Sequence, residues 1–208
     1  MKVTLLIVRH GQTNFNLEHR MDGLNDTILT DKGIRQAEAL GNFLSRYKIN
    51  FVYSSPLSRA IKTAKSIIKY QTADLIINSI DNFKEINCGK CTGLTRSEVE
   101  VRFPELIKEW NKNTDPPFPD GENLQDVESR AIPIVENIVS KHSGKTILIS
   151  GHGSLNVAII GYFLQIPPAL RFKIRQDNCC VNILEFEDGL LHFVRGINIA
   201  PQLQSTIA

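Results

Sequence analysis

The 208-residue sequence lacks long apolar runs and lacks a large net charge, and each absence excludes a class of protein. No segment approaches the ~20 apolar residues of a membrane-spanning helix. The apolar run at residues 3–8 is too short for a secretion signal. The formal net charge is only +2, so bulk charge does not favour a nucleic acid or a membrane surface as partner. We therefore expect a cytoplasmic protein that binds neither.

Several motifs of phosphate chemistry and metal binding are also missing. No cysteine is followed six positions later by arginine, and no Asp-x-Asp, His-Glu-x-x-His or Walker motif occurs. Cys88 and Cys91 form a Cys-x-x-Cys pair, which can be a redox dithiol or half of a zinc site completed by Cys179 and Cys180. Adjacent cysteines rarely share one tetrahedral metal, so we expect reduced thiols that pack as small apolar groups, with no metal and no cofactor.

Short apolar runs alternate with helical patterns along the chain. This alternation predicts one α/β domain over residues 1–208, a three-layer α/β/α arrangement with a mostly parallel central sheet. Ser55 is expected to cap a helix whose first position is Pro56, and Thr30 to cap another. The stiff, polar segment 114–121 suggests a surface lid or pocket wall. The predicted strands are 3–8, 51–53, 75–77, 146–149, 181–186 and 190–195, and the predicted helices are 31–47, 57–69, 96–102, 105–111, 124–141 and 154–164.

Reactive side chains follow the predicted strands. Ligands of open α/β sheets bind beyond the carboxyl ends of the strands. Each residue alone has an ordinary alternative reading, such as a turn histidine, a surface arginine or a solvated carboxylate. Their shared position at one sheet edge is what favours a site. The residues concerned are Arg9, His10, Arg59, Glu85 and His152.

These side chains suit the transfer of a phosphoryl group. Arginine binds phosphate oxygens through two parallel hydrogen bonds, and free backbone N–H groups in the turn 11–13 would favour the same anion. Imidazole is unprotonated near neutral pH, so His10 can attack phosphorus while His152 donates to a phosphoryl oxygen. Glu85 can protonate the leaving oxygen and later deprotonate the attacking water.

With these residues identified, the sequence resembles the histidine phosphatase superfamily, the phosphoglycerate mutase-like enzymes. The resemblance implies a phosphoglycerate mutase-like fold, a phosphorylated His10, Glu85 as proton donor, and a phosphate pocket lined by Arg9, Asn16, Arg59 and His152, without metal. Thr13 and Gly23 complete the predicted substrate-binding set. Four motifs carry the resemblance in the family order: Arg9-His10-Gly11-Gln12-Thr13 with Asn16, the segment 30–37, the segment 54–60, and Ser150-Gly151-His152-Gly153.

One motif departs from the family pattern. The family often reads Glu-x-x-Phe-Gly-x-Trp-Glu-Gly after the acid. Here Glu85, Gly89 and Gly93 keep their places, while Cys88 and Cys91 replace the aromatic residues. The assignment of the acid is unaffected, but the shape of the pocket, and with it the substrate, does not follow from the resemblance.

The expected activity is hydrolysis of a small phosphorylated metabolite through a phosphohistidine, and the fold allows a homodimer. One alternative is a cofactor-dependent phosphoglycerate mutase. Such mutases carry a longer insertion with paired arginines, whereas segment 110–113 has no adjacent arginines. Segment 119–123, followed by Arg130, resembles the Gly-Glu-Ser segment of the phosphatase branch. A non-catalytic phospholigand-binding protein is a further alternative, and its expected mark would be the loss of His10 or Glu85.

Overall fold

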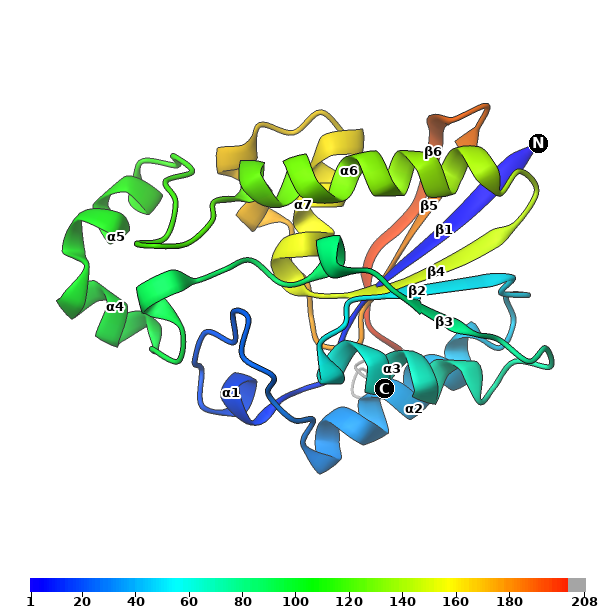
Figure 1. Ribbon diagram of the computed structural model, residues 1–208, viewed down its shortest axis with the longest axis horizontal. Helices are drawn as coiled ribbons and strands as arrows, with labels where there is room; N and C mark the ends of the chain where they lie inside the picture. Colours follow the sequence, from blue (N-terminus) through cyan, green and yellow to red (C-terminus); the bar gives the residue numbers. More distant parts are fainter. Residues whose placement is uncertain (202–208) are drawn as a thin grey trace, which may run out of the picture.

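The computed structural model describes residues 1–201, in which six strands form one mixed sheet in the order β3-β2-β4-β1-β5-β6 (Figure 1). The pairs β3/β2, β2/β4 and β4/β1 are parallel, whereas β5 and β6 join antiparallel at one side. The prediction of a mostly parallel sheet is thus confirmed. The strands are β1 Lys2–Arg9, β2 Phe51–Ser54, β3 Ile77–Ser79, β4 Thr146–Gly151, β5 Val181–Glu187 and β6 Leu190–Ile199.

Helices connect the strands and begin where local caps allow. The Thr30 hydroxyl accepts a hydrogen bond from the Gly33 N–H, which starts one helix as predicted. Reciprocal capping boxes start two others, through Thr95 with Glu98 and through Asn123 with Asp126. The α-helices are α1 Asn14–Leu17, α2 Asp31–Leu44, α3 Ser58–Ile68, α4 Arg96–Arg102, α5 Pro104–Asn111, α6 Leu124–Lys141 and α7 Gly153–Phe163, and the short 3-10 helices are η1 Asp81–Phe83, η2 Gly89–Cys91 and η3 Pro168–Lys173.

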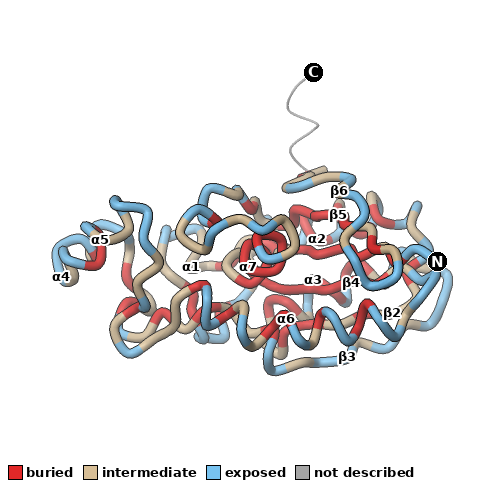
Figure 2. The backbone as a smooth tube through the Cα atoms, turned by 90° about the horizontal axis from the view of Figure 1, so that it is seen from above, coloured by how far each residue is buried: buried red, intermediate tan, exposed pale blue. Residues whose placement is uncertain are grey.

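The sheet separates two hydrophobic cores, because alternate side chains of a strand point to opposite faces. Leu5 and Ile7 of β1 pack into a cluster with α6 and α7, while Leu6 and Val8 pack with α2 and α3. Figure 2 shows the buried backbone gathered on the strands and on α7, with α4 mostly exposed. The arrangement is therefore the predicted three-layer α/β/α, with α4 and α5 lying to one side of the sheet in Figure 1.

Three local predictions were wrong. Strand β3 begins at Ile77, because Leu75 and Ile76 precede the ladder to β2, and Ile76 is exposed. Helix α3 begins at Ser58 with Leu57 as an N-cap that makes no side-chain cap bond, so Ser55 and Pro56 lie in the turn before it. The Ser58 N–H is instead bound by the Asp26 carboxylate at 2.6 Å.

The cysteines are free, buried thiols, as the sequence suggested. Cys88 and Cys91 lie in one core and Cys179 in the other, while the Cys180 thiol donates to the Gln176 side-chain oxygen at 3.4 Å. Burial raises the pKa of all four thiols, to about 12 for Cys180. At neutral pH these thiols are therefore protonated and are poor nucleophiles. Within residues 1–201 no three histidine, cysteine or acidic side chains group closely enough to hold a metal ion. No helix in the same part of the chain is long and apolar enough to cross a bilayer.

Candidate active site

The register of the sheet brings His10 and His152 together. Arg9 of β1 pairs with Gly151 of β4. His10 directly follows Arg9 in the sequence, and His152 directly follows Gly151. The His10 N–H donates to the Gly151 carbonyl at 3.1 Å. The two imidazole rings lie with their centroids 5.2 Å apart in an edge-to-face arrangement. Two side chains separated by 142 positions in the sequence therefore share one site at the carboxyl ends of the parallel strands.

The imidazole of His10 is oriented by a backbone carbonyl. Its Nδ1 lies 2.7 Å from the Gly11 oxygen, and because a carbonyl oxygen only accepts, Nδ1 carries the proton. The Nε2 atom then keeps its lone pair. Burial lowers the pKa of His10 well below 6.5, and the nearby charges of Arg59 and Arg9 lower it further. His10 is consequently a neutral imidazole with Nε2 available for attack.

Two arginines supply positive charge beside these rings. Arg59 is fully buried on the first turn of α3, and it donates to the carbonyls of Asn25 at 2.6 Å and Gly23 at 2.9 Å. Burial lowers the pKa of Arg59, against the opposing effect of the Asp22 and Glu85 carboxylates. Arg9 donates through Nη1 to the Gln176 carbonyl at 2.6 Å. Both guanidinium groups thus donate to backbone carbonyls and are not paired with a carboxylate through two hydrogen bonds. Their positive charge is therefore available to an anion.

The carboxylate of Glu85 is set at the N-terminus of α7. Its Oε1 accepts hydrogen bonds from the backbone N–H groups of Ile86 at 2.9 Å and Ser154 at 3.2 Å. A Cβ placed on Gly153 would lie 3.9 Å from Glu85 Oε2 and 3.7 Å from Arg9 Nε. The predicted acid and one predicted arginine therefore both lie close to the residue that follows His152.

Several polar atoms of this group are buried without a hydrogen-bond partner in the described part of the chain. They are Arg9 Nε, Arg59 Nε and both ring nitrogens of His152, together with Asn156 Oδ1. Burial and the charges of Arg59, His10, Arg9 and Arg130 hold the pKa of His152 well below 6.5. A buried polar group without a partner is costly. Nitrogen donors from three residues gathered beside His10 are well explained by an anion that they bind together.

Asn16 and Thr13 belong to a network around a residue that the sequence analysis missed, Asp22. The Asp22 carboxylate accepts hydrogen bonds from Asn16 at 2.6 Å, Thr13 at 3.0 Å and Thr27 at 2.6 Å. The Thr13 hydroxyl also caps α1, and Thr13 is fully buried. Thr13 is thus engaged within the protein, whereas Asn16 reaches the cavity described below.

The turn 11–13 does not offer the free N–H groups that the sequence suggested. The Gly11 N–H donates to the Thr63 hydroxyl, and the Gln12 N–H donates to the Gln36 side chain. The Thr13 N–H donates to Asn16 Oδ1, and α1 has only four residues. These partners come from α2, α3 and α1, so this expectation was wrong. Through these bonds the turn supports His10 and is tied to three helices.

A cavity of about 560 Å³ opens onto this group. Four predicted site residues line it, namely Arg9, Asn16, Gly23 and Glu85. His10, Arg59 and His152 are at most 1% exposed and are not among the residues that line the cavity. The predicted pocket-wall segment contributes Thr114 and Phe118, and another part of the lining comes from the segment 169–176.

Other residues that the sequence analysis missed hold the site from outside. The Asn178 side chain donates to the His10 carbonyl at 3.2 Å and to Asn16 Oδ1 at 2.8 Å. The Gln176 side-chain oxygen accepts from Asn156 and from Asn182, at 3.1 and 2.8 Å. An Asn or Gln in a loop carries no local signal of such a role, because its partners lie on distant elements. The remaining histidines are not in the site: His142, for example, stacks on Phe51 and bonds Tyr53.

Comparison with known proteins agrees with this geometry. The family model of the histidine phosphatase superfamily, branch 1, matches residues 5–198. A 2,3-bisphosphoglycerate-dependent phosphoglycerate mutase of Bartonella henselae is 33% identical over 166 residues, 77% of this chain and 81% of its own. Phosphoserine phosphatase 1 of Hydrogenobacter thermophilus is 28% identical over 187 residues, 89% of this chain and 88% of its own.

A solved structure of mycobacterial glucosyl-3-phosphoglycerate phosphatase in complex with VO3 has a TM-score of 0.85 at 25% identity, covering 94% of this chain and 98% of that one. The chain thus belongs to the histidine phosphatase superfamily, and the fold is phosphoglycerate mutase-like, as the motifs indicated. The expected class of activity, an enzyme of the phosphomonoesterase type, is likewise confirmed at the level of the family.

Proposed function

We propose that the protein hydrolyses small phosphomonoesters through a phosphohistidine formed on Nε2 of His10. The observation that carries this proposal is the neutral His10 ring, fixed by the Gly11 carbonyl, beside buried nitrogen donors of Arg9, Arg59 and His152 that have no partner. Phosphoryl transfer depends chiefly on positioning and on stabilising charge, and this arrangement provides both.

In the first step, the arginines and Asn16 hold the phosphate oxygens of the ester. Nε2 of His10 forms a bond to phosphorus while the bond from phosphorus to the ester oxygen breaks. The bonding pair goes to that oxygen, which takes a proton from the carboxylic acid of Glu85 and leaves as the alcohol. His152 donates to a phosphoryl oxygen as negative charge develops in the transition state.

In the second step, water attacks the phosphohistidine. Glu85, now ionised, takes a proton from the water while the new oxygen–phosphorus bond forms and the bond to Nε2 breaks. Inorganic phosphate leaves and His10 returns to its neutral form. The charge balance needs no metal, because two guanidinium groups face the transferred group. Activity that persists in excess chelator is therefore expected.

The cavity limits the substrate to a small metabolite. A volume of about 560 Å³ is within the usual range for small-molecule sites. The names of the similar proteins, phosphoserine phosphatase and glucosyl-3-phosphoglycerate phosphatase, indicate the kind of ester to test first. The similarity to a phosphoglycerate mutase keeps transfer back to a phosphoglycerate as the second candidate function.

The test is a panel of phosphomonoesters assayed for phosphate release, with mutase activity measured on 3-phosphoglycerate in the presence of 2,3-bisphosphoglycerate. The wild type should release phosphate, and His10→Ala should reduce kcat by at least about 10⁴-fold, as for loss of a nucleophile. His192→Ala, at an exposed ring remote from the cavity, is the matched control and should retain activity. Ligand binding without turnover by the wild type would instead support the phospholigand-binding alternative.

Three further expectations remain predictions. A single domain over residues 1–208, a cytoplasmic location and a homodimer are all compatible with the described residues. Limited proteolysis, cell fractionation and analytical ultracentrifugation, respectively, test them.

A further inference from the structure

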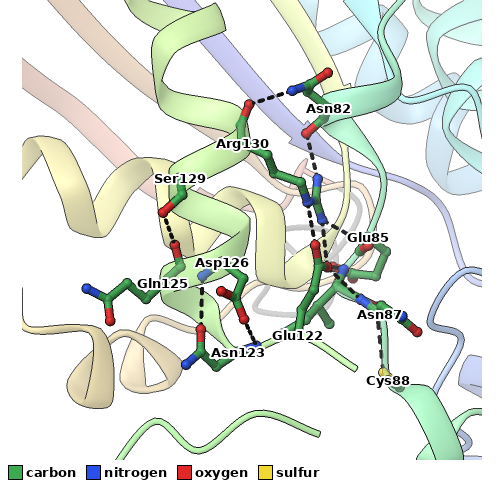
Figure 3. Close-up of polar contacts among 11 residues, drawn as sticks. Asn82, Glu85, Asn87, Cys88, Glu122, Asn123, Gln125, Asp126, Ser129 and Arg130 are labelled. Carbon is green, nitrogen blue, oxygen red and sulfur yellow. Dashed lines mark hydrogen bonds and ion pairs between the residues drawn. The ribbon is translucent and has the colours of Figure 1, made fainter. Parts of the chain in front are cut away.

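We infer that Arg130, together with Glu122, is a positioning residue that sets the carboxyl group of Glu85 for proton transfer. This inference rests on the proposed function, because it assigns Glu85 its role as acid. Figure 3 shows Arg130 reaching from α6 to the loop that carries Glu85, with Glu122 beside it.

The loop around Glu85 has little regular structure of its own. Residues 84–88 lie between η1 and η2, outside any strand or helix. Among residues 1–201, the carboxylate of Glu85 accepts hydrogen bonds from backbone N–H groups only, and from no side chain. The position of the carboxylate therefore depends on the backbone of residues 82–87 and on the Ser154 N–H of α7.

Arg130 binds that backbone at two points. Its Nη1 donates to the Asn82 carbonyl at 2.6 Å, and its Nη2 donates to the carbonyl of Glu85 itself at 3.1 Å. In return the Asn82 side chain donates to the Arg130 carbonyl at 2.9 Å. These bonds hold the loop against α6, which a lysine could not do with the same geometry, because it lacks the planar fork.

Glu122 binds both Arg130 and the loop, so that Arg130 and Glu122 together form a clamp on residues 82–87. Its two carboxylate oxygens accept from Arg130 Nε at 2.9 Å and Nη2 at 3.1 Å, the paired geometry that orients a guanidinium. The same carboxylate accepts from the Asn87 N–H at 2.8 Å, and the Glu122 N–H donates to the Asn87 carbonyl at 2.9 Å. The loop is thus bound on both sides of Glu85, by one ion pair whose side chains are 20% and 24% exposed.

A purely stabilising role predicts a different result from a positioning role. Partly exposed ion pairs contribute little to stability, so loss of this pair should leave the protein folded. Displacement of the acid should slow esters whose leaving oxygen needs protonation, and spare those whose leaving group departs as an anion. A misplacement of about 1 Å costs about 100-fold in rate.

The experiment compares kcat/KM for an alkyl phosphate, such as O-phosphoserine, with kcat/KM for 4-nitrophenyl phosphate. This parameter covers the steps up to release of the alcohol. The variants are Arg130→Met, Arg130→Lys and Glu122→Gln, with Glu85→Gln as the reference. Asp126→Ala is the matched control, because it removes the capping box of the same helix and does not touch the Glu85 loop.

We expect Arg130→Met and Glu122→Gln to lose about 100-fold on the alkyl ester and only a few-fold on 4-nitrophenyl phosphate. Arg130→Lys should recover part of the loss, and Asp126→Ala should leave the ratio of the two esters unchanged. In the double variant Glu85→Gln with Arg130→Met, the alkyl ester should lose nothing beyond Glu85→Gln alone.

Equal losses on the two esters, or losses that add in the double variant, would overturn the inference. If Arg130→Met does not fold, Glu122→Gln and Arg130→Lys decide the same question. The wild type and Arg130→Met should both still form a phosphohistidine from 4-nitrophenyl phosphate. Absence of that intermediate from the wild type would instead refute the proposed function, so the two failures are distinct.

Discussion

The two buried histidines make the stability of the protein depend on pH in a window where few carboxylates titrate. Burial lowers the pKa of His10 and His152 well below 6.5 in the folded state, while the unfolded chain keeps a value of ~6.5. As pH falls below that value, the unfolded chain binds protons that the folded protein does not. The free energy of unfolding therefore falls with pH from ~6.5 down to the folded-state pKa values.

The magnitude follows from this proton balance. Between about pH 7.5 and about pH 5.5, each neutral buried histidine lowers the free energy of unfolding by about 1.4 kcal/mol. The two together lower it by about 2.7 kcal/mol. His142, whose pKa is also lowered by partial burial, adds a smaller loss in the same direction. Carboxylates with lowered pKa values, such as Asp177, lose their contribution to stability mainly at pH values below this range.

Urea unfolding at several pH values measures this effect, with the free energy obtained by linear extrapolation. The variant His10→Gln should lose about 1.4 kcal/mol less than the wild type between the two pH values, because one titrating group is gone. The comparison variant His142→Gln, at a ring that is only partly buried, should lose less of the dependence than His10→Gln does. A wild type whose stability does not change over this range, or a His10→Gln variant with an unaltered pH dependence, would refute the assignment of a neutral buried pair.

Two further substitutions test the support of the site. In Gly33→Ala the new Cβ would lie 2.1 Å from the Gln12 carbonyl, so the turn behind His10 must shift. We expect a loss of about 1–3 kcal/mol in thermal unfolding and a fall in kcat, and an unchanged kcat would contradict the support of His10 by that turn. In Arg59→Lys the fork to the Gly23 and Asn25 carbonyls is lost. A charged hydrogen bond contributes about 1.5–3 kcal/mol, so kcat/KM should fall about 10- to 150-fold, and a change below about threefold would argue against phosphate binding by Arg59.

Local sequence signals predicted most of the fold. The continuous apolar composition of β1 and β4 is typical of parallel strands with both faces covered, and both lie in the centre of the sheet. The apolar composition of α7 is typical of a buried helix, and most of its residues are buried. The predicted β3 was displaced because Leu75 and Ile76 have the composition of a strand, while the ladder to β2 depends on a neighbour that local sequence does not specify.

In the site, too, features set by local sequence could be predicted, whereas contacts between distant segments could not. His10, Arg59 and His152 could be placed together because each follows a strand, and parallel strands end at one edge. The state of the backbone N–H groups in the turn 11–13 could not be predicted, because Thr63 and Gln36 bind them from positions 52 and 24 residues away. The clamp of Arg130 on Glu85 likewise spans 45 positions and leaves no periodic signal.

The central claim is that Nε2 of a neutral His10 forms the bond to phosphorus. Rapid acid-free quenching during turnover, followed by ³¹P NMR and peptide mass spectrometry of the phosphoenzyme, tests it directly. The hydrogen bond from Nδ1 to the Gly11 carbonyl predicts a single phosphoryl group on His10 at Nε2. A phosphoryl group on Nδ1, on another residue, or on none while phosphate is still released would contradict the account.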